Sequence, residues 1–412
     1  MRSRIHALLA LASLVGACSG EAPVLEPAPD AGAADPAPPG PPPRLLWASP
    51  LYRHMAPQVA TDGDGNVYVS DSGGVVYPRP PPCRPEESGT VTKFDPSGKQ
   101  LWVRCFHSLV ADLAVGRGGR IVLATVGGLD SVELHALDGE GVERWKWTGH
   151  IAGINPIARV TVGPLGHVIA ALGSAPIDRP ADRTIRVQQL LPDGTPGWVR
   201  GLDSGYTLQA VASDDTGSYF VAAQGLAGTY DGGDGPKDYP SGIVWWKLDS
   251  TGVPRLTRRM PGPASFGNTL VTLAADERLL WLAGATDRPS EVRAFDVTTG
   301  ADAWRTDLPG ARGRPAIAAA GEGRLAVVTS QPGTVSWVRA LASLDLFDDR
   351  GKKVWSTWHP THSPTGMDDD SEPTSVAVSA GKVVVGGHFR GVVDFGAGSY
   401  AADACFLARF EL

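Results

Sequence analysis

The sequence has little of what several classes of protein need. Its 412 residues carry a formal net charge of −7, which argues against a nucleic-acid partner because phosphate binding requires a basic surface. The apolar run Ala7–Val15 is far shorter than the roughly 20 residues of a membrane-spanning helix. Helix breakers are abundant instead. The 51 glycines and 35 prolines make up about a fifth of the chain and disfavour a helix-rich fold.

Short catalytic motifs are also missing. The chain has no Gly-x-Ser-x-Gly elbow, no His-Glu-x-x-His or His-x-x-x-His pair, and no two adjacent cysteines. An enzyme of this sequence would therefore need a site assembled from residues that are far apart along the chain.

The N-terminus predicts export and a lipid anchor. Arg2 and Arg4 precede the apolar run, and the small residues after it end in Cys18, as in a secretory signal. The stretch Leu14–Cys18 resembles the bacterial lipobox, in which the cysteine becomes the lipidated first residue. We expect a signal peptide over residues 1–17 and lipidation of Cys18, the alternative being a secreted protein cut at the same bond without lipid.

The residue after Cys18 is Ser19 rather than the aspartate that favours inner-membrane retention in the best-known sorting system. By that resemblance we expect the outer membrane of a bacterial envelope. Residues 18–43 follow as a tether, because residues 19–43 hold nine prolines and no apolar period from which a core could form. In polyproline geometry the tether could reach up to about 80 Å.

Residues 44–412 contain a repeated unit of four predicted strands. Two apolar strands flank an Asp/Gly/Asn turn, as in Val59–Val69, and after a variable loop come a strand ending near Asp-x-x-Gly and a strand with tryptophan. The sharpest marker is a glycine followed four residues later by tryptophan, at Gly98/Trp102, Gly141/Trp145, Gly194/Trp198, Gly300/Trp304 and Gly351/Trp355. After Gly252 the tryptophan slot holds Leu256.

The spacing of the repeat predicts a β-propeller. The tryptophan slots are 43 to 58 residues apart, which suits blades of four strands. The last strand, Phe406–Phe410, matches the third strand of a blade, and Arg44–Trp47 matches the missing fourth. Pairing these ends gives a seventh blade and about 53 residues per blade. We therefore predict an all-β fold, a seven-bladed propeller over residues 44–412.

The recurring tryptophans are predicted to be structural. A ring at a fixed slot of each outer strand can wedge against the neighbouring blade, so we assign this docking role rather than ligand binding to six residues. They are Trp47, Trp102, Trp145, Trp198, Trp304 and Trp355.

One copy of the repeat resembles a known family. Ala294–Trp304, AFDVTTGADAW, is similar to the tryptophan-docking repeat of quinoprotein-type, PQQ-like and WD-like propellers. The tail Gly386–Phe410 resembles repeats of bacterial cell-surface propellers. Quinoprotein dehydrogenases of this type have eight blades and an adjacent cysteine pair, so we do not expect quinone-dependent oxidation here. In size and anchoring the chain is similar to the propeller lipoproteins that act as scaffolds in outer-membrane barrel assembly, which also have eight blades.

Three long insertions, 71–90, 225–241 and 357–374, are predicted to share one face of the propeller. Two are acidic and could offer oxygen ligands to Ca²⁺, although neither has the spacing of a complete calcium loop and solvated turn acids explain them equally. The candidate ligands are Asp231, Asp234, Asp238, Asp368, Asp369 and Asp370. The stretch Asp62–Asn66 resembles half an EF-hand loop, but it stands where a hairpin turn is required.

Four histidines fall in connections predicted on the same face, namely His107, His150, His359 and His362. If they converged on the central channel they could bind Zn²⁺ or act as acid and base, whereas scattered surface histidines are the alternative.

The remaining cysteines suit an oxidising compartment. Cys83 lies in the first long loop and Cys105 ends the following fourth strand, so a disulfide between them would pin that loop. Cys405, on a predicted third strand, would then be a buried odd thiol.

Together these features predict a monomeric envelope lipoprotein whose propeller binds a protein or a surface glycan without catalysis. It would contact the membrane only through its lipid, and we predict no cofactor beyond the candidate Ca²⁺. The alternative is an envelope hydrolase or lyase with a metal or carboxylate site at the channel mouth.

Overall fold

The computed structural model describes most of the chain after the predicted tether. The described residues are 44–51, 57–71, 83–84, 86–116, 118–127, 130–151, 156–174, 184–202, 205–225, 228–231, 236–239, 242–261, 271–284, 290–332, 340–359, 370–394 and 399–412. Within these ranges the regular structure is all strand, with no helix and hence none that is long and apolar enough to cross a membrane. The predicted signal peptide, Cys18 and tether lie outside the described residues and stay predictions.

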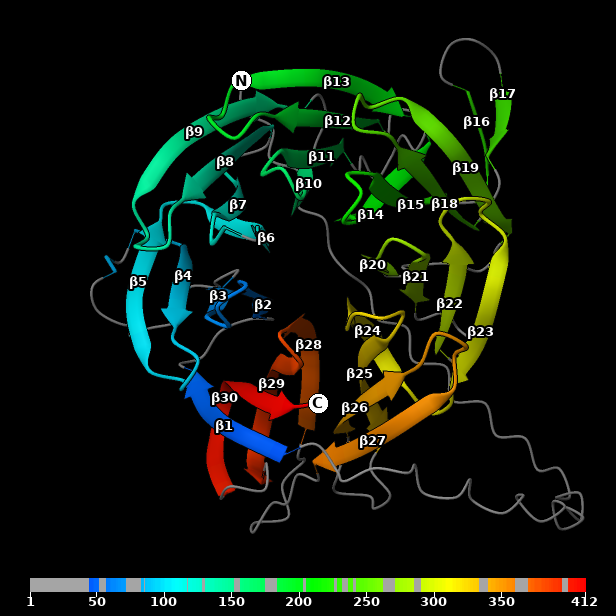
Figure 1. Ribbon diagram of the computed structural model, residues 1–412. Coiled ribbons are helices and arrows are strands. Elements are labelled where there is room, and N and C mark those ends of the chain that lie inside the picture. Colours follow the sequence, from blue (N-terminus) through cyan, green and yellow to red (C-terminus); the bar gives the residue numbers. More distant parts are fainter. Residues whose placement is uncertain are drawn as a thin grey trace, which may run out of the picture. The chain divides into compact units, whose positions relative to one another are not determined.

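The strands form seven four-stranded antiparallel sheets arranged as blades around a central axis (Figure 1), which confirms the predicted seven-bladed propeller. Blades 1 to 3 consist of β2 (Gln58–Thr61), β3 (Val67–Asp71), β4 (Gly89–Phe94) and β5 (Gln100–Phe106); β6 (Leu109–Val115), β7 (Ile121–Val126), β8 (Ser131–Leu137) and β9 (Glu143–His150); and β10 (Pro156–Val162), β11 (Val168–Ser174), β12 (Ile185–Leu190) and β13 (Pro196–Leu202).

Blades 4 to 7 follow the same order, with the chain's first strand placed last. They consist of β14 (Tyr206–Ser213), β15 (Tyr219–Gly225), β18 (Gly242–Leu248) and β19 (Pro254–Pro261); β20 (Val271–Ala275), β21 (Leu279–Gly284), β22 (Ser290–Asp296) and β23 (Asp302–Leu308); β24 (Arg312–Ala319), β25 (Leu325–Pro332), β26 (Ala340–Phe347) and β27 (Lys353–His359); and β28 (Asp370–Ser379), β29 (Lys382–Asp394), β30 (Ser399–Glu411) and β1 (Arg44–Leu51).

The two ends of the chain close the ring within blade 7. β1 pairs antiparallel with β30, from Arg44 opposite Glu411 to Leu51 opposite Cys405. An ion pair of 2.8 Å between the side chains of Arg44 and Glu411 joins the exposed ends of the two strands. The predicted closure, with the first strand of the chain as the fourth strand of the last blade, is therefore confirmed.

The hydrophobic core lies between blades. Each of the apolar clusters formed by the described residues joins strands of two neighbouring blades, and together they cover all seven blade boundaries. The second strand of a blade is covered on both of its faces, as in β11 and β15, where every residue is buried. This explains why these segments read as continuous apolar runs rather than alternating ones.

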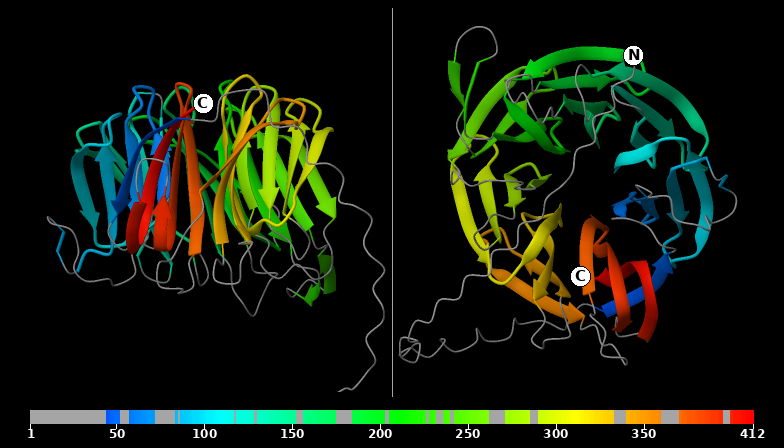
Figure 2. Two further views of the ribbon diagram at one scale, coloured as in Figure 1. Left: turned by 90° about the horizontal axis from the view of Figure 1, so that it is seen from below. Right: turned by 180° about the vertical axis from the view of Figure 1, so that it is seen from behind.

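The two faces of the ring differ in their connections (Figure 2). The first two strands of each blade are joined by a short turn on one face, which we call the turn face, and in blades 1 to 6 the last two strands are joined by a turn on the same face. Connections between the second and third strands, and from one blade to the next, leave from the opposite face, the loop face. The three predicted insertions belong there. Within 225–241 the structure adds the hairpin β16 (Gly228–Asp231) and β17 (Pro236–Tyr239), which the sequence analysis treated as loop.

Candidate functional site

The tryptophans of the outer strands contact the next blade through a shared geometry. In four of them the indole Nε1 donates to a backbone carbonyl in the turn between the third and fourth strands of the following blade. The pairs are Trp47 with Pro96 O, Trp102 with Gly139 O, Trp145 with Pro192 O and Trp198 with Ser250 O, at 2.9 to 3.0 Å. The indole thus lies at a blade boundary, where it contributes to packing and to hydrogen bonding.

The glycine of the marker is required by this docking. Gly194 has φ +87°, a left-handed conformation that side chains disfavour, and a Cβ there would lie 2.7 Å from Cγ of Trp145. This glycine is therefore required for the docking of the tryptophan of the preceding blade. The tryptophan four residues later in its own blade docks onto the next one.

Three slots depart from the common geometry. Leu256 replaces tryptophan in blade 4 and packs against Gly300, whereas Trp304 Nε1 is buried without a hydrogen-bond partner. Trp355 is 8% exposed and packs beside Leu45 and Leu412, because blade 7 has chain ends where the other blades have a turn.

A second donor supports the same turn carbonyls. Lys93 Nζ donates to Gly139 O at 2.8 Å, and Lys247 Nζ donates to Val297 O at 3.0 Å, where the tryptophan slot holds Leu256. Arg409 in β30 donates through Nη1 to Gly65 O at 2.7 Å and to Pro96 O at 3.0 Å. Burial lowers the pKa of this guanidinium, although nearby Asp62 opposes the effect. Arg409 therefore ties the last strand to blade 1.

Aspartates close the tight turns through their side chains. The Oδ1 atom of Asp249 accepts from the hydroxyl of Thr251 at 2.7 Å and from the backbone N–H groups of Thr251 and Val253. The Thr251 hydroxyl, followed by these N–H groups and Arg255, lowers the pKa of the Asp249 carboxyl. The pKa is also lowered, by hydrogen bonds within the same turns, for Asp95, Asp138, Asp193 and Asp296.

The turn at Asp62, which resembles half a calcium loop, is a hairpin turn of the same kind. Its Oδ1 atom accepts from the N–H groups of Asp64 and Asn66, and its Oδ2 atom accepts from the hydroxyl of Tyr68 at 2.9 Å. Burial, together with this hydrogen bond, raises the pKa of Tyr68. The structural interpretation of this segment agrees with these contacts.

Polar groups of the innermost strands line a hollow at the centre of the ring. The strand register shifts through extra residues in four of these strands, and the carbonyls of the bulged residues Ala111 and Gln209 accept side-chain N–H groups. Arg159 of blade 3 donates through Nε to Gln209 O at 2.9 Å and through Nη1 to Ala111 O at 3.4 Å. Its guanidinium therefore connects blades 2, 3 and 4.

Other blade boundaries carry similar bonds around a hollow of about 240 Å³ at this level. Gln58 donates to Ala111 O, Thr272 to Pro315 O and Ser375 to Pro57 O, while Asp112 accepts the N–H of Val160. The polar groups around the hollow are thus used to clamp blades together. The sequence analysis did not predict these hydrogen bonds around the hollow, because the bonded residues are about 50 residues apart and the bulges have no sequence marker.

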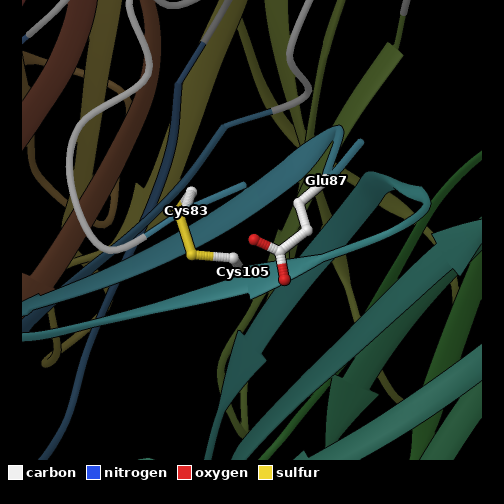
Figure 3. A group of neighbouring side chains, drawn as sticks. All are labelled: Cys83, Glu87 and Cys105. Carbon is white, nitrogen blue, oxygen red and sulfur yellow. A yellow bond between two sulfur atoms is a disulfide. The ribbon is translucent and has the colours of Figure 1, made fainter. Parts of the chain in front are cut away.

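The disulfide proposed from the sequence is present in the structure. Cys83 is bonded to Cys105 at the end of β5, so it fixes the loop that precedes β4 to the outer strand of blade 1. The carboxylate of Glu87 lies beside the two sulfur atoms (Figure 3). Within the described ranges this is the one grouping of three His, Cys, Asp or Glu residues with metal-ligand spacing, and both of its sulfurs are in the disulfide.

The structure does not test the candidate calcium ligands. Asp231 ends β16, Asp238 lies in β17 and Asp370 begins β28, whereas Asp234, Asp368 and Asp369 lie outside the described residues. Calcium binding by these acids stays a prediction.

Two of the four candidate histidines lie away from the channel, in agreement with the alternative of scattered surface histidines. His107 follows β5 and His150 ends β9, and both are exposed at the rim, because the fourth strand is the outermost strand of each blade. His359 ends the outer strand β27, and His362 lies outside the described residues.

Sequence reasoning also missed a buried histidine in blade 2. The Nδ1 atom of His135 lies 2.7 Å from Glu143 Oε2, and its Nε2 atom lies 3.3 Å from Thr125 Oγ1. Lys146, and then His135, lower the pKa of Glu133. The alternation of Glu133 and His135 along one strand indicates that both side chains lie on the same face of the sheet. The residues of β9 that contact them could not be predicted, because the register between the two strands was not known.

Comparisons with known proteins show the fold and no more. Neither a scan against protein-family models nor a search of curated proteins finds a match. The β-propeller domain of Cps50 (Swd1) from Myceliophteria thermophila is 11% identical over 90% of this chain and all of its own, with a TM-score of 0.53. BBS1N, solved in complex with ARL6DN, is 9% identical over 90% of this chain and 97% of its own, also with a TM-score of 0.53. BamB from Moraxella catarrhalis is 14% identical over 90% of this chain and all of its own, with a TM-score of 0.43. The chain is therefore similar to propellers whose sequences have diverged widely.

Proposed function

We propose that the protein is a bacterial envelope lipoprotein whose propeller binds a protein or surface glycan through the loop face, without catalysis. Cys18 would carry the lipid, and residues 19–43 would link it to the propeller. The proposal joins the export signal of the N-terminus to the two unlike faces of the ring.

The unlike faces are the observation that carries the proposal. The turns before the outer strands of blades 1 to 6 follow a repeated pattern of aspartate and glycine, which leaves little room for variation between blades. Connections on the loop face differ in length and sequence from blade to blade, and one of them contains the hairpin β16–β17. Variable loops on a rigid scaffold are where binding surfaces usually lie.

The point at which the chain enters the propeller supports use of the loop face. Arg44, the first residue of β1, pairs with Glu411 at the end of β30, and both lie on the turn face. The covalent link to the tether is therefore on the face opposite the loops.

The polar groups of the central channel favour a binding role over catalysis, because they are already engaged in hydrogen bonds between blades. Arg159 donates to the backbone carbonyls of Ala111, Ala158 and Gln209, and Asp112 accepts a backbone N–H from blade 3. Groups held in this way stabilise the ring and are poorly placed to exchange protons with a substrate. BBS1N shows that a propeller can bind a protein, since it is solved in complex with ARL6DN.

The test is crosslinking of the lipidated protein in its own membranes, followed by purification and identification of what remains bound. Two loop variants replace residues 228–239 or 360–369 by short Gly-Ser links, which leaves the blade strands intact. We expect a stoichiometric protein or glycan partner that is lost from at least one loop variant.

The Cys18→Ser variant is the matched control. It should leave the membrane fraction and keep its partner in solution, whereas the loop variants should stay in the membrane without it. A partner retained by both loop variants, or no partner at all, would contradict the loop-face proposal. Membrane retention of Cys18→Ser would contradict the lipid anchor.

A further inference from the structure

A hollow of about 570 Å³ lies on the turn face between blades 2 and 3. Its walls come from the first turns of both blades and from the turns that precede their outer strands. The lining residues used below are Arg120, Asp138, Arg144, Pro164, Leu165 and Pro192. This site is on the opposite face from the loops that the proposed function invokes.

The first turns that border this hollow differ in charge from those of blades 1, 4, 5 and 6. The first turns of blades 1, 4, 5 and 6 carry carboxylates, at Asp62 and Asp64, Asp214 and Asp215, Asp276 and Glu277, and Glu322. The first turns of blades 2 and 3 begin with Gly116 and Gly163 and contain none, and the first turn of blade 7, residues 379–382, also contains none. Asp138 is the single acid among the lining residues, and it forms an ion pair with Arg144.

Arg120 provides a cation that can accept a further partner. Its side chain is half-buried, and the one hydrogen bond that the described residues give its guanidinium runs from Nη1 to Gly166 O at 3.2 Å. A guanidinium has five N–H donors in a planar fork that matches a carboxylate. An anionic side chain entering the hollow would therefore find unused donors.

An apolar surface lies next to this cation. Leu165 is 76% exposed, the highest value among the exposed large hydrophobic residues of the described chain. Pro164 and Pro192, which also line the hollow, are rigid and cannot fold away from solvent. An exposed leucine between prolines in a concave site favours contact with an apolar side chain.

We propose that this hollow docks an extended segment of a partner protein in which an apolar side chain stands next to aspartate or glutamate. The apolar group would cover Leu165, and the carboxylate would pair with Arg120. Charge complementarity selects this occupant. The carboxylates in the first turns of blades 1, 4, 5 and 6 disfavour such a segment, whereas the first turns of blades 2 and 3 carry none.

The test is selection of a phage-displayed library of random 12-residue peptides on the Cys18→Ser chain. We expect enrichment of peptides with an apolar residue beside an acidic one. A labelled consensus peptide is then titrated against variants by fluorescence anisotropy. Arg120→Glu should weaken binding at least about tenfold, because it replaces an attractive ion pair by a repulsive one.

Arg324→Glu is the matched control, since Arg324 ends the first turn of blade 6 just as Arg120 ends that of blade 2. It should leave the affinity unchanged, and Leu165→Asp should weaken it. The absence of an acidic–apolar consensus, or equal binding to the Arg120→Glu and Arg324→Glu variants, would overturn the proposal. The variant lacking residues 228–239 should still bind the peptide, so failure of the loop-face proposal would be seen separately.

Discussion

Each docking tryptophan contributes apolar area and one hydrogen bond, and blade 4 shows what remains when the indole is absent. Leu256 packs against Gly300 in the slot that tryptophan fills elsewhere, and Lys247 takes over the turn carbonyl. Packing at the slot is therefore indispensable, whereas the indole N–H can be replaced. Trp304 supports the same conclusion, because it fills the slot although its Nε1 is buried without a hydrogen-bond partner.

We predict that Trp198→Ala lowers the free energy of unfolding by about 3 kcal/mol, the low end for a large aromatic that is partly buried. Trp198→Leu, which copies the slot of blade 4, should lose about half as much, because it keeps the apolar contact and leaves Ser250 O without the indole donor. Denaturant unfolding measures both values. Val199→Ala, a neighbour on the same strand that is 43% exposed, is the control and should change stability little. A Trp198→Ala effect as small as this control would contradict the docking role.

At the scale of the element, the aspartates of the tight turns make the stability of the propeller depend on pH. The pKa of the aspartate is lowered in turns of blades 1 to 5, so each of these carboxylates is charged in the folded state where the unfolded chain would begin to protonate. A group with a lowered folded pKa stabilises the protein above the unfolded value, about 3.9 for aspartate, and this contribution is lost as the pH falls through the folded pKa.

We therefore predict that stability is level at neutral pH and falls as the pH drops below about 4. Asp249→Asn should be less stable than the parent at pH 7, with a difference that shrinks on acidification. Thermal melting between pH 7 and pH 2.5 tests this, with Asp302→Asn on the outer strand β23 as the control outside the turns. A difference that stays constant across this range would show that the Asp249 carboxylate does not act through its charge.

The elements also show what a sequence can and cannot predict. Asp-x-x-Gly recurs because the tight turn requires it, and the tryptophan slot recurs because each blade boundary must be packed, so the blades, their number and the closure by Arg44–Trp47 could be predicted. The bulges at Ala111 and Gln209 and the clamp of Arg159 could not, since they depend on the register of strands about 50 residues apart. The sequence left open whether His107 and His150 lie at the rim or at the channel, because a shared face does not fix the distance from the axis. The hollow beside Arg120 was missed because it depends on which turns become neighbours.

At the scale of the whole molecule, the ring is closed within blade 7 by the backbone ladder between the first and last strands of the chain. We call this ladder the seam. β1 is held by its ladder with β30, and Arg409 reaches from β30 to carbonyls of two turns of blade 1. In blade 1 the turn between Asp95 and Lys99 contains the three residues Pro96, Ser97 and Gly98. At the equivalent place in blade 7, Glu411 is followed by Leu412 alone before the partner Arg44, so two further residues would give a turn of the same length. A Ser-Gly link between Leu412 and Arg44 would restore a complete turn and place a glycine four residues before Trp47.

This link allows the seam to be moved, and its position should decide the stability of the ring. A circular permutant opened between Asp193 and Gly194 keeps the break within a blade, so a terminal strand still closes the ring through a backbone ladder. A permutant opened within residues 262–270 puts the break between blades 4 and 5, where Lys247 and the apolar cluster around Trp245 and Phe295 must hold the boundary by side chains alone. We predict that the second permutant is less stable by at least about 2 kcal/mol, because backbone hydrogen bonds of roughly 1 kcal/mol each no longer resist opening. Denaturant unfolding and the rate of limited proteolysis would measure the difference. Equal stability of the two permutants would mean that the contacts between blades, rather than the seam, keep the ring closed.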